Sequence, residues 1–140
     1  MTYPNDDVGH ILNKFKETQF VSLATIDGVR PRVRPMTLIY LDSRFWMVTS
    51  TASNKVAQIG QNPNVEFTYH FNEDGENRCI RILGKANIVR DENTKADIAK
   101  RIGFFSNHWS SPGDPDYTLL EIIPGELQYV THSGVSQFQL

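Results

Sequence analysis

Residues 23–36 read Leu-Ala-Thr-Ile-Asp-Gly-Val-Arg-Pro-Arg-Val-Arg-Pro-Met, and this stretch decides the expected fold. It begins within Phe20–Ile26, a run of apolar and β-favouring residues that predicts a strand. Asp27-Gly28 is a strong signal for a two-residue hairpin turn, because both residue types tolerate the positive φ that such turns need. The returning strand is predicted over residues 30–41. Its two prolines cannot donate to a ladder, so they place it at an edge, a bulge or a bend.

Further elements are predicted on both sides of this hairpin. Apolar residues at 8, 11, 12 and 15 have helical spacing. Gly84, in the middle of a long strand, marks a bulge or a close approach. Asn54 is the expected cap of a short helix. The other predicted strands are Arg44–Ser50, Val65–Phe71, a long strand that includes Ile80–Ile88, and Tyr117–Ile123 and Glu126–Thr131 around Pro124-Gly125; the predicted helices are Lys55–Gln61 and Asp91–Ile102.

The order of these elements predicts a mainly β (α+β) fold. Successive strands are joined by short turns, so the sheet is expected to be antiparallel. Closing six or seven such strands into a barrel removes most exposed edges. No repeat, linker or low-complexity segment divides the 140 residues, so we expect one domain over residues 1–140.

Composition and motifs exclude several classes of function. The net charge of −2 argues against a general nucleic-acid or membrane binder. Apolar runs are too short to span a bilayer, residues 1–13 lack a signal-peptide pattern, and there is one cysteine, so a cytoplasmic protein is expected. Neither a phosphate loop nor a dinucleotide fingerprint occurs, and the histidines lack metal-ligand spacing, so no metal site is predicted.

The positive charge of the chain is concentrated in residues 28–60, which carry five basic residues against Asp42. Residues 102–140 contain four acids and no lysine or arginine. On an extended strand, Arg30, Arg32 and Arg34 project to one side. Such a row is either a solvated strand face or a surface that binds a small anion.

The stretch 49–55, Thr-Ser-Thr-Ala-Ser-Asn-Lys, is the second candidate for anion binding. Its hydroxyls precede the start of a helix, where free N–H groups and a partial positive charge favour anions. Lys55 adds a full charge. The alternative is a simple capping loop with a surface lysine. Because both candidate segments flank the predicted hairpin over residues 30–50, they can face one ligand.

These residues resemble the FMN-binding split barrels of the pyridoxamine 5'-phosphate oxidase-like family, in particular its short general stress protein-like branch. The similarity rests on residues 23–28 (Leu-Ala-Thr-Ile-Asp-Gly), 31–36 (Pro-Arg-Val-Arg-Pro-Met), Phe45–Ser50, 53–55 (Ser-Asn-Lys), 62–65 (Asn-Pro-Asn-Val), 82–86 (Ile-Leu-Gly-Lys-Ala) and 116–121 (Asp-Tyr-Thr-Leu-Leu-Glu). It implies a six- or seven-stranded antiparallel split β-barrel with short flanking helices, and a homodimer with FMN at the subunit interface.

The resemblance also implies which residues hold the cofactor. Arg34 and Lys55 are expected to contact the phosphate, and the hydroxyl-rich loop to add hydrogen bonds. The backbone of residues 35–38 is expected beside the isoalloxazine edge. Trp109 either covers the flavin from the partner subunit or packs in the core or the interface. The full predicted set is Arg32, Arg34, Pro35, Met36, Thr37, Leu38, Val48, Thr49, Ser50, Ser53, Asn54, Lys55 and Trp109.

Two departures argue against vitamin B6 oxidation. Cys79 stands where the true oxidase has a glutamine, and no lysine or arginine follows Arg101, so the carboxy-terminal Arg-x-His motif is missing. We therefore expect a flavin-dependent oxidoreductase with an unknown small-molecule substrate and no catalytic residue that the sequence identifies. The alternatives are a non-catalytic flavin-binding or stress-response module, or the same fold with F420 or haem.

Overall fold

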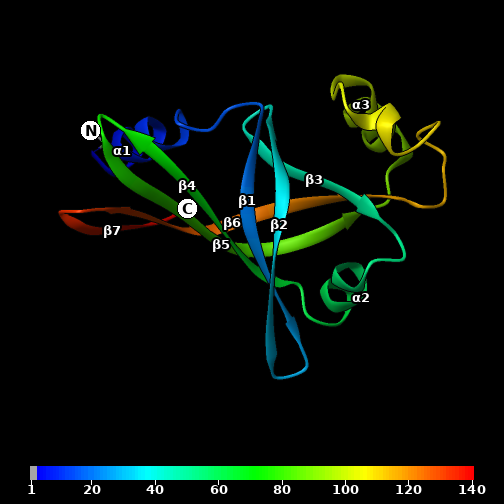
Figure 1. The fold of residues 1–140 in the computed structure, drawn as a ribbon, viewed down its shortest axis with the longest axis horizontal. Coiled ribbons are helices and arrows are strands. Elements are labelled where there is room, and N and C mark those ends of the chain that lie inside the picture. Colours follow the sequence, from blue (N-terminus) through cyan, green and yellow to red (C-terminus); the bar gives the residue numbers. More distant parts are fainter. Residues whose placement is uncertain (1–2) are drawn as a thin grey trace.

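Seven antiparallel strands form the body of the protein in a computed structural model that describes residues 3–140 (Figure 1). Their order in the sheet is β3-β2-β1-β4-β5-β6-β7, and pairing of β3 with β6 closes the ring. The predicted antiparallel split barrel is therefore confirmed. The strands are β1 (Thr18–Asp27), β2 (Arg30–Leu41), β3 (Arg44–Ser50), β4 (Asn64–Glu73), β5 (Glu76–Val89), β6 (Tyr117–Thr131) and β7 (Gly134–Gln139).

The β1–β2 hairpin forms where the sequence predicts it. Its register runs without a break from Thr18↔Ile39 to Asp27↔Arg30, and Gly28 in the turn has a φ of 64°. By contrast, β2 pairs with β3 only over Ile39–Leu41. Within the described residues, the outer edge of residues 30–38 is thus unpaired, which agrees with the edge position that the prolines predict.

The carboxy-terminal strands differ from the prediction. Pro124-Gly125 does not end a strand, because a bulge opposite Leu83/Gly84 absorbs the extra residue and β6 continues. At this point a Cβ on Gly84 would lie 2.1 Å from the carbonyl oxygen of Ile123, so the predicted close approach is confirmed. The mostly polar β7 was not predicted, since residues 134–139 carry little apolar alternation.

Helices cover three parts of the barrel: α1 (Tyr3–Leu12), α2 (Asn54–Gln61) and α3 (Glu92–Arg101), with a short 3-10 turn η1 (Phe105–Asn107) after α3. In Figure 1, α1 and α2 lie on opposite sides of the barrel. The first helix ends at Leu12, earlier than its apolar spacing predicts. Phe15 is nevertheless buried, because two tight turns bring it back onto the core.

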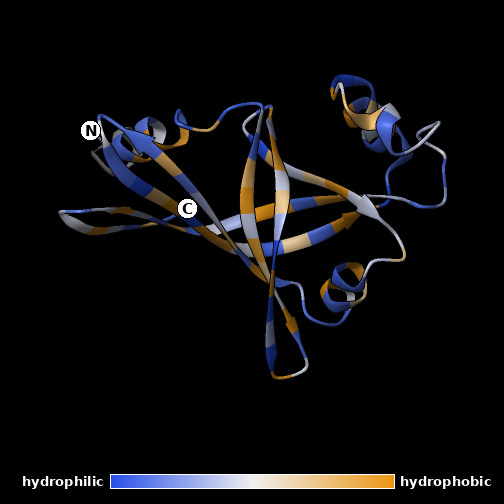
Figure 2. Ribbon diagram, in the orientation of Figure 1, coloured by the Kyte–Doolittle hydropathy of each residue, from blue (hydrophilic) through white to orange (hydrophobic). Residues whose placement is uncertain are grey.

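The buried residues form two clusters. The larger one fills the barrel and includes Leu23, Phe67 and Ile82, together with Ile11 of α1 and Ile59 of α2. Figure 2 shows how hydrophobic and hydrophilic residues alternate along the strands that enclose it. The smaller cluster lies between α3, η1 and the outer faces of β3 and β6. Because both faces are covered, residues 117–122 of β6 are buried one after another.

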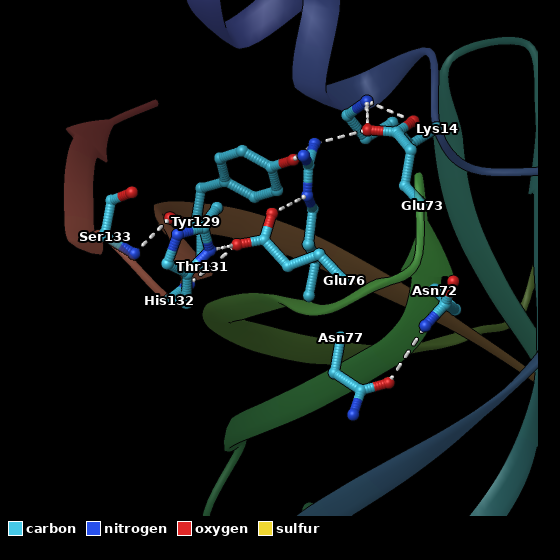
Figure 3. Close-up of polar contacts among 10 residues, drawn as sticks. Lys14, Asn72, Glu73, Glu76, Asn77, Tyr129, Thr131, His132 and Ser133 are labelled. Carbon is cyan, nitrogen blue, oxygen red and sulfur yellow. Dashed lines mark hydrogen bonds and ion pairs between the residues drawn. The ribbon is translucent and has the colours of Figure 1, made fainter.

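A polar network ties the segment after α1 to two hairpins (Figure 3). Lys14 donates to both carboxylate oxygens of Glu73 at 2.7 Å. Arg78 donates to Glu73, Glu76 and the hydroxyl of Tyr129. Glu76 in turn accepts from the backbone N–H of His132 at 3.1 Å. The network thereby links the β4–β5 and β6–β7 hairpins to the chain between α1 and β1.

Candidate functional site

Two open depressions contain most of the predicted site residues. The first, called here the aromatic depression, has a volume of about 490 Å³ and is lined by Phe20, Pro35, Met36, Thr37, Val48, Thr49, Ser50, Phe104, His108, Trp109 and Asp116. The second, the basic depression, measures about 620 Å³ and is lined by Asp27, Arg32, Val33, Arg34, Asn54, Lys55, Ala57 and Gln58.

The strand β2 contributes to both depressions, whereas β3 lines only the aromatic one and α2 only the basic one. On β2, Arg32 and Arg34 line the basic depression, and residues 35–37 line the aromatic one. Lys55 Nζ, in the basic depression, donates a hydrogen bond of 2.9 Å to Thr49 Oγ1, in the aromatic depression. One extended ligand with an anionic end and a flat ring can therefore contact both.

Arg34 is held by neutral oxygen atoms. Its guanidinium donates to Thr25 Oγ1 at 2.9 Å, to Gln58 Oε1 at 3.1 Å and to the Leu23 carbonyl at 3.2 Å. Burial lowers the pKa of Arg34, and the charge of Arg32 lowers it further. These contacts orient the guanidinium without neutralising it.

Lys55 has a similar environment. Burial lowers the pKa of the Lys55 ammonium, and the neighbouring charge of Arg34 adds to the effect. Among the described residues, neither Arg34 nor Lys55 forms an ion pair with an acid, whereas Arg32 lies 3.4 Å from Asp27. Two adjacent cations without a counter-ion favour the binding of an anion, because it would relieve their repulsion.

Ser53 provides an unsatisfied donor two residues before Lys55, although it lines neither depression. It occupies the N-cap of α2, so the helix begins one residue earlier than predicted and Asn54 is not the cap. Its side chain makes no capping hydrogen bond, and the buried Ser53 Oγ has no partner among the described residues. A buried hydroxyl without a partner is costly. An anionic oxygen at this helix terminus would satisfy it.

Asp116 organises the aromatic depression. Its carboxylate accepts hydrogen bonds from Ser50 Oγ at 2.5 Å and from Trp109 Nε1 at 3.1 Å. The hydrogen bonds from Ser50 and Trp109 lower the pKa of the Asp116 carboxyl, and backbone N–H groups of Ala52 and Thr51 lower it further. They also fasten the loop that follows α3 to the end of β3. Sequence reasoning assigned no role to Asp116, because its contact with Ser50 joins residues that are 66 positions apart in the chain.

Trp109 combines packing with a position at the depression. It is buried and lies against Phe105 and Tyr117, with ring centroids 5.2 and 5.3 Å away. This agrees with the core-packing interpretation, although the ring also lines the aromatic depression.

The remaining predicted residues differ in how they are placed. Leu38 is fully buried in the barrel core, so only its backbone is available to a ligand, and its carbonyl accepts from Gln19 Nε2 at 3.0 Å. Phe20, which sequence reasoning missed, is 78% exposed and lines the aromatic depression. An exposed phenylalanine gives no local signal that distinguishes a site from a simple surface residue.

The described part of the chain contains neither a metal-ligand cluster nor a membrane-spanning helix. No group of three or more His, Cys, Asp or Glu residues there is arranged to hold a metal ion. No helix there is both long enough and apolar enough to cross a membrane.

Comparisons with known proteins place the chain among relatives of the same architecture. General stress protein 26 of Bacillus subtilis (strain 168) is 28% identical over 116 residues, which cover 76% of each chain. A nimc/nima family protein from Clostridium acetobutylicum has a TM-score of 0.78 at 24% identity, covering 96% of this chain and 94% of that one. A heme binding protein from Mycobacterium smegmatis has a TM-score of 0.73 at 12% identity, covering 88% of this chain and 53% of that one.

These two structures share the fold with this chain at identities too low to show more. The family assignment rests on a match along most of the sequence. The sequence signature described as pyridoxamine 5'-phosphate oxidase matches residues 9–131, which include the β1–β2 hairpin and both depressions. The chain therefore belongs to the pyridoxamine 5'-phosphate oxidase family.

Proposed function

We propose that the protein binds FMN and acts as a flavin-dependent oxidoreductase on a small molecule. The observation that carries the proposal is the pair of neighbouring cations Arg34 and Lys55, which lack an acidic partner among the described residues. The unsatisfied Ser53 Oγ, two residues before Lys55, adds a hydrogen-bond donor at the start of α2. A phosphate monoester has the charge and the acceptor oxygens that this group requires. The adjoining aromatic depression has apolar and aromatic walls suited to the flavin ring.

Each part of the site has its own task in this proposal. Arg34, Lys55 and the start of α2 bind the phosphate, and the backbone of residues 35–38 lies along the ring. When bound, FMN supplies the redox chemistry. The protein orients the cofactor and limits the access of water to it. A cytoplasmic location is part of the proposal, supported by a single, buried cysteine that cannot form an internal disulfide.

The proposed substrate is not a vitamin B6 phosphate. No lysine or arginine follows Arg101, and the lining of the aromatic depression includes none. A second phosphate would therefore meet no lysine or arginine side chain of this chain there.

The proposed assembly is a homodimer with FMN at the subunit interface. Both depressions are open, and the exposed apolar side chains of Phe20 and Val33 lie at them. A second copy that covers these side chains would bury apolar surface and shield the cofactor from water.

Titration with FMN tests the proposal, followed by the visible absorption and fluorescence of the flavin. We expect saturation at one FMN per chain. Loss of a charge-assisted hydrogen bond corresponds to about 1.5–3 kcal/mol, so Arg34→Ala and Lys55→Ala should each weaken binding about 10- to 100-fold. Arg30→Ala removes the same charge from an exposed position of β2 outside both depressions and should change the affinity little.

Two results would contradict the proposal: no binding of FMN by the folded protein, or equal affinity in the wild type and in both site variants. Sustained turnover with a nicotinamide nucleotide or another donor distinguishes an oxidoreductase from a flavin-binding module without catalysis. F420 is tested by the same titration.

Haem is the second candidate ligand. The fold is shared with a heme binding protein, and His108 lines the aromatic depression with an exposed side chain. Imidazole is a common axial ligand of haem iron. A Soret band that appears on addition of hemin and is lost in His108→Ala would favour haem over FMN.

A further inference from the structure

The charged residues that line the aromatic depression differ from those of the neighbouring basic depression. Its lining includes one carboxylate, Asp116, and no lysine or arginine. The other titratable side chain in the lining is His108. The cations Arg32, Arg34 and Lys55 line the basic depression instead. The two halves of the proposed cofactor site therefore differ in charge, because lysine and arginine side chains line only the basic depression.

Asp116 is both fixed and accessible. Hydrogen bonds from Ser50 and Trp109 occupy one acceptor position on each of its oxygens. An ionised carboxylate offers about four such positions. The backbone N–H groups of Ala52 and Thr51 also donate to the carboxylate, and the residue is exposed at the depression, so its negative charge is accessible to a ligand there. Asp116 forms no ion pair among the described residues, so no lysine or arginine side chain neutralises its charge.

The walls around this carboxylate suit a flat cation. Phe20, Phe104 and Trp109 contribute aromatic surface to the lining, and Phe20 is largely exposed. Aromatic faces attract cations within about 6 Å through the negative potential of the ring. A carboxylate beside aromatic faces therefore favours a delocalised positive charge over a neutral ring, and a neutral ring over an anion.

We propose that the aromatic depression, beside the bound flavin ring, recognises planar aromatic molecules that carry a positive charge, with Asp116 as the residue that determines this specificity. The inference deepens the proposed function and rests on it, because such a molecule is the substrate class that would meet the bound flavin. It assigns to Asp116 a role in selecting the substrate and none in binding the FMN phosphate.

Three nearly isosteric probes test the proposal on the FMN-loaded protein: 1-methylnicotinamide, which is cationic, nicotinamide, which is neutral, and nicotinate, which is anionic. Their binding is followed by equilibrium dialysis, and FMN occupancy is read separately from the flavin spectrum. All three probes are compared at one pH and one ionic strength. We expect the cation to bind about tenfold more tightly than the anion, with the neutral probe between them.

Two matched variants locate the effect. Asp116→Asn keeps the shape of the side chain and removes its charge, so it should abolish the preference for the cation when the variants are compared at equal FMN occupancy. Asp114→Asn makes the same charge change two residues away, at a side chain outside the lining of the aromatic depression, and should preserve it.

The possible outcomes are distinct. If FMN binds and the three probes bind equally, or nicotinate binds best, the inference is overturned and the proposed function remains. A cation preference that survives Asp116→Asn also overturns it. If FMN does not bind to the folded wild type, the proposed function and the inference fail together.

Discussion

Individual side chains of the site are held by groups that leave their charge uncompensated. Arg34 donates to a hydroxyl, an amide oxygen and a backbone carbonyl, and Lys55 donates to a hydroxyl. Neutral acceptors orient a cation and preserve its attraction for a ligand, whereas a carboxylate would compete with that ligand. This arrangement stabilises the free protein less than ion pairs would, and it keeps the two cations available to an anion.

Gly84 is the residue whose side chain the fold can least accommodate. A Cβ there would meet the Ile123 carbonyl oxygen at 2.1 Å, and this oxygen cannot move aside easily because it belongs to the backbone of the paired strand. Gly84→Ala should lower the free energy of unfolding by about 3 kcal/mol, which corresponds to roughly 10 °C in Tm. Thermal unfolding followed by circular dichroism measures the change.

Gly125 provides the control on the facing strand. Its added Cβ would lie 3.6 Å from the nearest atom, an ordinary contact. Gly125→Ala should therefore leave Tm nearly unchanged. Equal destabilisation by both substitutions would show that the bulge, and not the contact at Gly84, limits stability.

At the scale of elements, ion pairs attach the amino-terminal segment to the barrel. Lys14 follows α1, and its ammonium contacts Glu73 at the end of β4 (Figure 3). The hydrogen bond from Lys14 lowers the pKa of Glu73, and the charges of Lys14 and Arg78 contribute further. The carboxyl group thus joins a helix and a hairpin only while it is ionised.

The stability contributed by Glu73 should depend on pH. A pKa lower in the folded state means that the contribution is fully present above the ordinary value of 4.5 and is lost as pH falls through the folded value. Glu73→Gln should therefore be less stable than the wild type at pH 7, and the difference should shrink below about pH 4.5. Denaturant unfolding at a series of pH values measures it.

A matched substitution controls for the general loss of an acid. The side chain of Glu17 is exposed and makes no hydrogen bond within the described part of the chain, so Glu17→Gln should match the wild type at each pH. A difference between Glu73→Gln and the wild type that stays constant down to pH 2 would contradict the assignment to the ionised carboxylate.

For the whole molecule, exposed apolar side chains are distributed unevenly. Val33 is 70% exposed and lies between the two arginines that line the basic depression. Val135 is 61% exposed on β7, the outer strand that pairs with β6. If the proposed dimer covers the cofactor site, Val33 lies near the dimer interface. Val135 lies on a different strand and serves as a control position.

Charged substitutions at these two valines test the proposed dimer. The wild type should sediment at about twice 16.0 kDa. Val33→Glu should weaken self-association at least about tenfold and lower FMN affinity, because a carboxylate is costly to bury in an interface. Val135→Glu should retain both properties. A wild type that sediments as a monomer, or a dimer unaffected by Val33→Glu, contradicts the proposed interface.

Strands that depend on local signals were predictable from the amino-acid sequence. Residues 30–41 and 44–50 are strands with the predicted bounds, because turn residues and β-favouring side chains mark both ends. The basic cluster was also identified, since its residue types occur close together in two short segments. Family membership followed from the order and spacing of the same segments.

Tertiary structure alone decided what depends on residues far apart in the chain. Pro124-Gly125 indicates a turn locally, but pairing with β5 turns it into a bulge in one long strand. Asp116 meets Ser50 across 66 residues, and Phe20 reaches the aromatic depression from β1. The sequence could not show these contacts, because closing the barrel brings the segments together, and their local residue patterns are compatible with many other arrangements.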